Sequence, residues 1–537
     1  MSNNALLSTT ISLVALQLGS RLFSFGLNQL LLRSTTPLAF GVATIQFDTL
    51  RDTVLFLLRE GIRGAVVRTR SKSTSSIPQR QSRLLPVLLA PLVLPIFYTF
   101  SLYTSSKPSN SSHSLTLSLY ALSTILELLS EPCYLLTLQH WETLTSARVR
   151  IEGLAVVSKA LGTLFALRAL DPSKALEAYG WGQLAYSLTL LVGFNYSIRR
   201  KADKEETNWS LVQKDGVYFD REVKELGWAL TKQSVVKQVL TEGDKLAVSK
   251  FGKVEDLGGY AVALNYGSLI ARILFQPLEE SSRLYFSSLS SSSSYPSLSS
   301  LLSISSHLSL ILTFYTHLSL ILILLCPYYI SPLLTLLLGP LWSTTASPTL
   351  KAYLYSLPFL AFNGLLEAAF QSLASRNWLR WLSWWMGVCT VGFAGTVWIT
   401  MGRNSSEGWG SRGLVLGNCV NMGMRIGFSI NFLKRYFMKH TRRGSSMGEM
   451  KEDSEGEETG RGEKQVEQVW KNLKWSTWIP SIYTIVAFVV AGAVCRWSER
   501  RWEVATVGDV GRGRGLRALG EHLGIGAIAG IACLGVM

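Results

Sequence analysis

The sequence predicts an all-α polytopic membrane protein with about fourteen transmembrane helices, in two pseudo-symmetric six-helix bundles plus two C-terminal helices. Of its 537 residues, 48% are hydrophobic and only 16% are charged, more apolar than a soluble core of this size requires. The apolar residues fall into blocks of roughly twenty, the length that a helix needs to cross about 30 Å of hydrocarbon. Polar residues mark equivalent helices in both halves of the chain.

The apolar blocks define the expected helices. The first block lacks the basic start and the small-residue cleavage site of a signal peptide, so we expect it to remain as a helix. A Gly-x-Ala helix that ends on acid plus Arg recurs in both halves, beginning near Phe40 and near Gly258. This weak repeat predicts two bundles related by a pseudo-two-fold axis along the membrane normal. The expected spans are 5–32, 37–58, 84–104, 115–138, 151–170, 176–198, 228–248, 257–278, 301–326, 353–373, 379–401, 414–437, 479–494 and 516–536.

The polar stretches between these blocks divide the chain into domains. A serine run over 287–306 and an acidic stretch over 444–462 are too polar to order themselves by burial, so we expect both to be solvated loops. The expected domains are an N-lobe (1–198), a cytosolic connector (199–227), a C-lobe (228–437), a cytosolic disordered loop (438–478) and a last helix pair (479–537).

The distribution of Lys and Arg predicts the orientation. Basic loops follow the second, sixth and twelfth helices, so the positive-inside rule places these loops and both termini in the cytosol. The N-x-S/T triplets at Asn110 and Asn404 then fall on the lumenal side, as glycan acceptors would. The Arg-rich loop at 496–517 disagrees with this scheme. Either the last two helices are placed wrongly or that loop departs from the rule.

Four helices carry polar residues at helical spacing, and they are the first two of each half. A charge at the bilayer centre costs about 2.5–3.5 kcal/mol, so such side chains turn toward protein or water. Residues three or four apart share one helix face. The stripes are Gln17, Arg21, Ser24 and Asn28; Asp48, Asp52, Arg59 and Arg63; Lys237, Thr241, Asp244 and Lys245; and Asn265, Ser268, Arg272, Gln276 and Glu279.

If the four stripes converge, they line a hydrated, cationic cavity between the lobes. Such a cavity would be a binding site for an anionic head group. The alternative is that these side chains form inter-helix ion pairs that fix packing without any ligand. Three acids, Asp48, Asp52 and Asp244, are candidates for coupling to a proton or cation. The predicted substrate-binding residues are Arg21, Asn28, Arg59, Arg63, Lys237, Lys245, Asn265, Arg272, Gln276 and Glu279.

Motifs for nucleotide hydrolysis and for a histidine metal pair do not occur in the sequence. It has no phosphate-binding G-x-x-x-x-G-K-[ST] loop, and its six histidines make no ligand pair at i, i+4 spacing. Its six cysteines are scattered singly. We therefore expect no enzyme activity, no cofactor and no metal site. The net charge of +16 resides in loops without interleaved aromatic residues, which excludes nucleic acid as the expected partner.

Several ordered segments resemble one family over most of the chain. The run from Asn265-Tyr266-Gly267-Ser268 through Arg272 to Arg283 is the most specific. Other matching segments are Ser20–Arg33, Phe40–Gln46, Arg59–Arg63, Ser130–Pro132, Arg148–Gly153, Leu240–Lys245 and Phe359–Gly364. They are similar to the oligosaccharide-lipid translocation proteins of eukaryotic N-glycosylation. The serine run, the acidic loop and the last two helices match poorly.

The resemblance implies residence in the endoplasmic reticulum membrane and a fold like the multidrug, oligosaccharide-lipid and polysaccharide exporters. It implies a role in presenting dolichol-diphosphate heptasaccharide, Man5GlcNAc2-PP-dolichol, to the lumenal side, with membrane lipid and the glycosylation enzymes of that membrane as partners. Two interpretations stay open beside translocation. One is a non-transporting accessory protein that binds or shields the lipid-linked oligosaccharide, and the other is export of unrelated amphiphiles, which the Asn265–Arg283 run disfavours.

Overall fold

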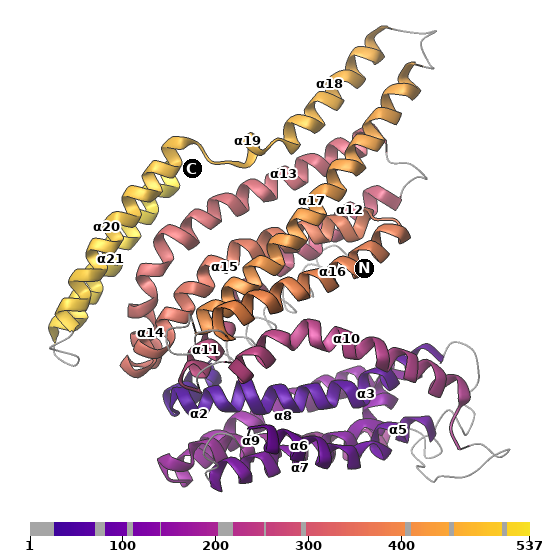
Figure 1. Cartoon of the computed structure of the whole chain (residues 1–537), viewed down its shortest axis with the longest axis vertical. Coiled ribbons are helices and arrows are strands. Elements are labelled where there is room, and N and C mark those ends of the chain that lie inside the picture. Colours follow the sequence, from indigo (N-terminus) through magenta and orange to yellow (C-terminus); the bar gives the residue numbers. More distant parts are fainter. Residues whose placement is uncertain are drawn as a thin grey trace, which may run out of the picture. The chain divides into compact units, whose positions relative to one another are not determined.

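A computed structural model describes residues 26–69, 81–104, 111–139, 141–201, 218–251, 254–291, 297–402, 410–449, 456–506 and 513–536. All regular secondary structure in these ranges is helical (Figure 1), which agrees with the predicted fold class. The chain divides into two compact units, Met1–Lys250 and Phe251–Met537.

The first unit begins with a helix over residues 26–33. A second continuous helix consists of α2 (Pro37–Gly41), a π-helical segment η1 (Val42–Asp48) and α3 (Thr49–Thr69). Thr36 caps its start, since the Thr36 hydroxyl accepts a hydrogen bond from the Ala39 amide at 3.3 Å, and Pro37 takes the first helical position, where a missing amide hydrogen costs nothing. The extra residue of the π turn rotates α3 relative to α2, so the stripe of the second helix is not strictly periodic.

The third predicted helix is broken into short segments. These are η3 (Ser82–Leu84), α5 (Leu85–Leu88), η4 (Ala90–Leu92) and α6 (Val93–Thr104). Pro86 and Pro91 lie at the starts of α5 and η4, where each proline removes a backbone donor and interrupts the α-helical bonding.

The rest of the first unit is long helices. These are α7 (Ser111–Gln139), α8 (Trp141–Ala169), the single turn η5 (Pro172–Lys174), α9 (Ala175–Lys201) and α10 (Arg221–Phe251). Close approach of α8 and α9 depends on Gly182, where a Cβ atom would lie 1.8 Å from Thr163 Oγ1. Similarly α10 packs on α3 at Gly61, where a Cβ atom would lie 2.7 Å from the carbonyl oxygen of Gly227.

This packing bears on the boundary between the units. The sequence suggested that the second lobe starts at residue 228, whereas α10 groups with the first unit up to Lys250. The reason lies in its apolar side chains: Val223, Leu226 and Leu230 pack against a buried cluster that includes Ile62 of α3 and Leu135 of α7.

The second unit opens with two long interrupted helices. The first comprises α11 (Val254–Ile270), η6 (Ala271–Phe275) and α12 (Gln276–Ser291), and the second comprises α13 (Leu298–Leu320), η7 (Ile321–Leu325), η8 (Cys326–Tyr329) and α14 (Ile330–Leu338). In the serine run, expected to be a loop, Ser297 instead caps α13 by accepting from the Ser300 amide at 3.1 Å. Short hydroxyl side chains are well suited to this position.

Three more long helices complete the core of the second unit. These are α15 (Pro340–Leu373), α16 (Arg376–Val397) with its π-helical end η9 (Trp398–Gly402), and α17 (Ser411–Glu449). Gly339 separates α14 from α15 with φ of 101°, a conformation that glycine adopts without strain. Helix α15 contacts α11, α12 and α17.

The acidic stretch and the C terminus differ in part from expectation. Within 438–478, expected to be disordered, α17 continues to Glu449, and α18 (Gly456–Leu473) and α19 (Trp475–Trp478) come after it. Helix α18 packs on α13, and the buried Asn472 amide donates to Ser305 Oγ at 3.2 Å. This burial accounts for order that composition did not predict. Helices α20 (Ile482–Thr506) and α21 (Gly513–Val536) pack on each other.

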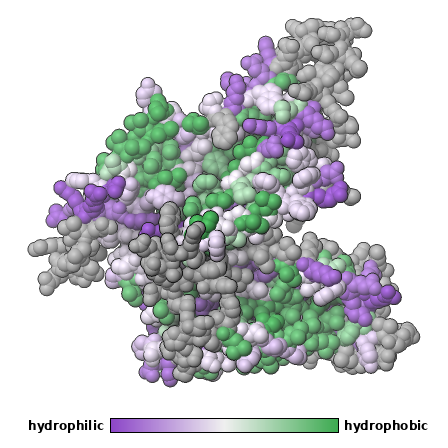
Figure 2. Space-filling view, in the orientation of Figure 1, coloured by the Kyte–Doolittle hydropathy of each residue, from purple (hydrophilic) through white to green (hydrophobic). Residues whose placement is uncertain are grey.

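Six helical stretches within the described ranges are long and apolar enough to cross a membrane: Ser82–Leu102, Ser112–Gln139, Leu298–Leu338, Asn377–Met401, Ile482–Trp502 and Arg517–Gly535. On the face seen in Figure 2, hydrophobic side chains gather over the middle of the helices in each unit. The chain is therefore a multi-pass membrane protein. The count of fourteen helices and the pseudo-symmetry stay predictions.

Candidate functional site

Three arginines of α3 face two glutamates of α7 inside the first unit. Arg51, Arg59 and Arg63 lie eight and four residues apart, so they project from similar sides of the helix. Glu127 and Glu131, four residues apart on α7, are only 2% and 1% exposed. Carboxylates this deeply buried require partners, and the arginines supply them.

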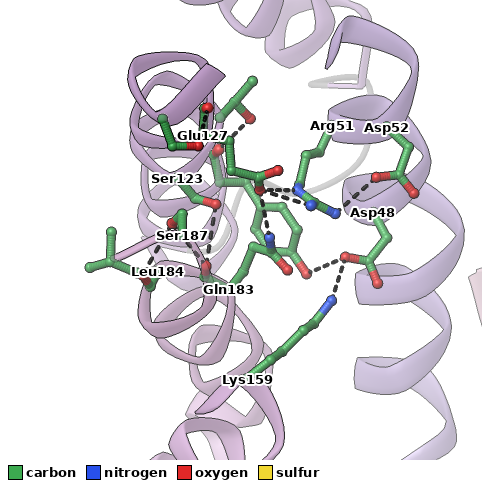
Figure 3. A network of polar contacts seen from close by, with 12 residues as sticks. Asp48, Arg51, Asp52, Ser123, Glu127, Lys159, Gln183, Leu184 and Ser187 are labelled. Atoms are coloured by element: carbon green, nitrogen blue, oxygen red, sulfur yellow. Dashed lines mark hydrogen bonds and ion pairs between the residues drawn. The ribbon is translucent and has the colours of Figure 1, made fainter. Parts of the chain in front are cut away.

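The pairs are specific. The Arg51 guanidinium lies 2.8 Å from Glu127 Oε1, and Arg63 pairs with Glu131, with its Nη2 donating to Oε2 at 2.9 Å. Arg59 lies between them, 3.7 Å from Glu127 and 3.8 Å from Glu131. Figure 3 shows the Arg51–Glu127 pair, together with the amide of Gln183 from α9, which donates to Glu127 at 3.2 Å.

Aspartates of the second helix extend this network. Asp48 accepts a hydrogen bond from Tyr120 of α7 at 3.2 Å. It accepts another from Lys159 of α8 at 3.1 Å, which Figure 3 shows. Asp52 accepts from Arg51 at 2.8 Å and stays 54% exposed. Both acids proposed for ion coupling on this helix thus have a cationic partner, and Asp52, 54% exposed against 25% for Asp48, is the more accessible of the two.

A second, smaller network lies in the second unit. Glu367 of α15 pairs with Arg425 of α17 and also accepts from Gln371 at 3.0 Å. Glu279 of α12 pairs with Arg283 at 2.8 Å. A Cβ atom at Gly364 of α15 would lie 2.7 Å from Glu279 Oε2, so the missing side chain of this glycine lets the carboxylate approach α15.

Arg272 differs from the arginines of the first unit. Its side chain is exposed and, among the described residues, donates within its own helix, to the Ser268 carbonyl oxygen at 3.2 Å and to Ser268 Oγ at 2.9 Å. No carboxylate of the described residues pairs with it. Its charge is therefore available to an anion. The charges of Arg51 and Arg63, in contrast, are already neutralised by glutamates.

The other predicted site residues have these positions. Asn28 and Asn265 are half-buried, Gln276 donates to Glu280 at 3.3 Å, and Lys245 pairs with Glu242 at 2.7 Å. Arg21 and the side chains of Lys237 and Asp244 lie outside the described residues. Convergence of the four stripes stays a prediction.

Sequence reasoning left Glu127, Glu131, Glu367 and Arg425 out of the site, although each interrupts an apolar stretch of its helix. That position was the signal that could have identified them, because a charge within an apolar stretch needs a partner on a neighbouring helix. Among the described residues, no group of three or more His, Cys, Asp and Glu side chains could hold a metal ion.

Comparisons with known proteins give consistent results. The model of the family described as "Rft protein" matches residues 6–537. Man(5)GlcNAc(2)-PP-dolichol translocation protein RFT1 of Candida albicans is 33% identical over 461 residues, covering 80% of this chain and 81% of that protein. The protein of the same name in Yarrowia lipolytica is 31% identical over 488 residues, covering 80% of this chain and 70% of that protein.

A solved structure resembles nearly all of the chain. The lipid II flippase MurJ, in an inward closed conformation, superposes with a TM-score of 0.58 and covers 96% of this chain and 97% of its own. Sequence identity is 13%, so this likeness shows the fold alone.

Proposed function

Because the chain belongs to the Rft protein family, we propose that it handles Man5GlcNAc2-PP-dolichol in the endoplasmic reticulum membrane and translocates it from the cytosolic to the lumenal leaflet. The observation that carries the proposal is the likeness, along about four-fifths of the chain, to relatives named for translocation of this lipid. The flippase-like fold supports a transport function.

The proposed topology has fourteen spanning helices, with both termini in the cytosol. Two six-helix bundles flank a cationic cavity, and the last two helices stand apart. Lobes that rock about such a cavity would expose its contents first to one side and then to the other. Glycosylation enzymes of the same membrane are further proposed partners.

Within the cavity, Arg272 is the residue best suited to the diphosphate, because its guanidinium is exposed and no described carboxylate pairs with it. Arg21, Lys237 and Lys245 would add positive charge, and Asn28, Asn265 and Gln276 would meet sugar hydroxyls. Arg59 and Arg63 would bind the diphosphate only if a phosphate displaced Glu127 and Glu131 from them. Glu279 would contact a ligand only if it released its ion pair with Arg283.

We propose no covalent step, cofactor or metal for this function. With no nucleotide-binding loop in the sequence, net direction would come from lumenal consumption of the product or from an ion gradient. Asp52 is the better candidate for coupling than Asp48, because both are ion-paired but Asp52 is 54% exposed and Asp48 only 25%. Asp244 is the third candidate.

Reconstitution tests the proposal. Purified protein in liposomes, supplied with labelled heptasaccharide lipid, should move it faster than empty liposomes do. Arg272→Gln should weaken lipid binding about 10- to 100-fold, since a charge-assisted hydrogen bond contributes about 1.5–3 kcal/mol. The matched control is Arg221→Gln, which removes an arginine that is 87% exposed on α10. Equal transport by both variants would count against phosphate binding at Arg272.

The second candidate function is a non-transporting accessory protein that binds or shields the same lipid. The observation that favours it is the neutralisation of the α3 arginines by Glu127 and Glu131, which leaves fewer charges to drive a diphosphate through the molecule. Binding without accelerated transfer in the liposome assay would select this alternative.

A further inference from the structure

One face of α16 is not covered by the described residues of the second unit. Within the candidate span Asn377–Met401, only 22% of the most apolar window is buried. Large apolar side chains recur along the helix at three- or four-residue spacing: Trp381, Trp384, Val388, Val391 and Trp398 are 67%, 78%, 44%, 73% and 60% exposed. This is the periodicity of a single helix face. Since the helix contacts α17 on its other side, this apolar face is the one that the described second unit leaves available to lipid.

The spacing of the tryptophans matches a bilayer. Trp398 lies 14 residues beyond Trp384 and 17 beyond Trp381, which at about 1.5 Å per residue is about 21–26 Å along the helix. Tryptophan concentrates at the two membrane interfaces, where its ring meets both lipid and head groups. The beginning of α16 therefore lies at one interface and η9 at the other.

A cavity opens at the beginning of this face. Its volume is about 560 Å³, and it is lined by Asn377, Arg380, Trp381 and Trp384. The described lining residues all come from the first turns of α16, so the cavity is open to the surface. Asn377 and Arg380 form its polar part and the two tryptophan rings its apolar part, a combination that suits an amphiphile. The size lies within the range of about 300–1,000 Å³ typical of sites for small ligands.

Positive charge in the cavity has no acidic partner in the described part of the chain. Arg380 Nη2 donates to Asn377 Oδ1 at 2.6 Å, which orients the guanidinium and leaves its other N–H groups available. The capping residue Ser375 makes no side-chain hydrogen bond to the helix start. The partial positive charge of a helix N-terminus therefore adds to that of Arg380.

We propose that this cavity binds one anionic glycerophospholipid from the surrounding bilayer. Arg380 holds the head-group phosphate, Trp381 and Trp384 flank the glycerol region, and an acyl chain follows Val388 and Val391 toward the bilayer centre. The ligand is negatively charged because the site offers a guanidinium and a helix N-terminus without a carboxylate. In the topology proposed above, this end of α16 meets the cytosolic leaflet, where acidic lipids create a negative surface potential.

Native mass spectrometry of the full-length protein from nanodiscs tests the inference, with phosphatidylinositol in a phosphatidylcholine background as the probe. We expect one phosphatidylinositol whose binding weakens about tenfold in Arg380→Gln, because a charge-assisted hydrogen bond is lost. Arg380→Lys should keep most of the binding, which guards against misfolding as the cause. Arg221→Gln, the matched control, should bind as the unmodified protein does.

Two results would overturn the inference. One is retention of phosphatidylinositol by Arg380→Gln at the level of the Arg221→Gln control. The other is equal occupancy by phosphatidylcholine alone, since a zwitterionic lipid does not need the arginine. The mass-spectrometric measurement does not depend on heptasaccharide-lipid transport. It can therefore be interpreted even if the protein does not translocate that lipid.

Discussion

Both units place a glutamate of a central helix against arginines of its neighbours, but the surroundings of these pairs differ. In the first unit, Glu127 and Glu131 of α7 are almost fully buried and are shared among three arginines of α3. In the second unit, the Glu367 and Arg425 side chains are 18% and 24% exposed.

Both networks contain buried atoms that make no hydrogen bond in the described structure, such as Gln183 Oε1 in the first unit and Asn363 Oδ1 in the second. The exposure of the paired carboxylates is what separates the two networks. A charge pair that water does not reach is costly to break, whereas a partly hydrated pair exchanges partners at a lower cost. The difference indicates that the α3–α7 network holds the first unit together and that the α12–α15–α17 network is the one able to change partners.

Glu127→Gln should have the largest effect. It leaves Arg51, whose side chain is 11% exposed, without its buried counter-charge, and breaking such a pair costs about 3–5 kcal/mol. Thermal unfolding in detergent measures the loss. As a control, Glu521→Gln removes a carboxylate that is 66% exposed and should stay within about 0.5 kcal/mol. Equal melting of the two variants would refute a stabilising role for the first network.

Glu367→Gln should cost less, about 1.5–3 kcal/mol, the range for hydrogen bonds to charged groups. Water reaches both Glu367 and Arg425 in part, so the arginine left behind is less strongly penalised. The same unfolding assay compares this variant with Glu127→Gln. A larger loss of unfolding free energy in Glu367→Gln than in Glu127→Gln would mean that the network of the second unit, and not that of the first, is the one that holds its helices together.

Gly182→Ala should destabilise the first unit by about 1–3 kcal/mol, the usual cost of overpacking. The new methyl group would lie 1.8 Å from Thr163 Oγ1 and 2.8 Å from the Lys159 carbonyl oxygen, and the backbone atom can move only if α8 and α9 separate. Unfolding temperature is again the readout. An unchanged value would mean that the two helices are not held at this distance.

Gly364→Ala should have the smallest effect on stability, below about 1 kcal/mol. Its methyl group would meet only the end of the flexible Glu279 side chain, at 2.7 Å. Displacing that carboxylate should instead alter the liposome transport assay if the second network changes partners during the cycle. Normal transport together with normal stability would remove Glu279 from the proposed mechanism.

Much of the fold can be derived from local sequence. The helix expected over 37–58 begins at Pro37 after its Thr36 cap, and it continues beyond the expected end to Thr69. The same local reasoning missed the order of α18, because charge-rich composition indicates solvation and does not reveal that Val469 and Asn472 become buried. It also missed the breaks at η1 and η6, where one π turn changes the helix phase.

Sequence alone was enough to identify a helical membrane protein, its family resemblance and the polar faces of the second and eighth predicted helices. Periodicity along one helix establishes which side chains share a face, because that depends only on residues a few positions apart. The partner of each face, in contrast, depends on how distant helices pack. Arg51 and Glu127 are 76 positions apart, and only the packing of α3 on α7 brings them together and neutralises the arginine. In the second unit, no described carboxylate packs against Arg272, so its charge stays available to an anion.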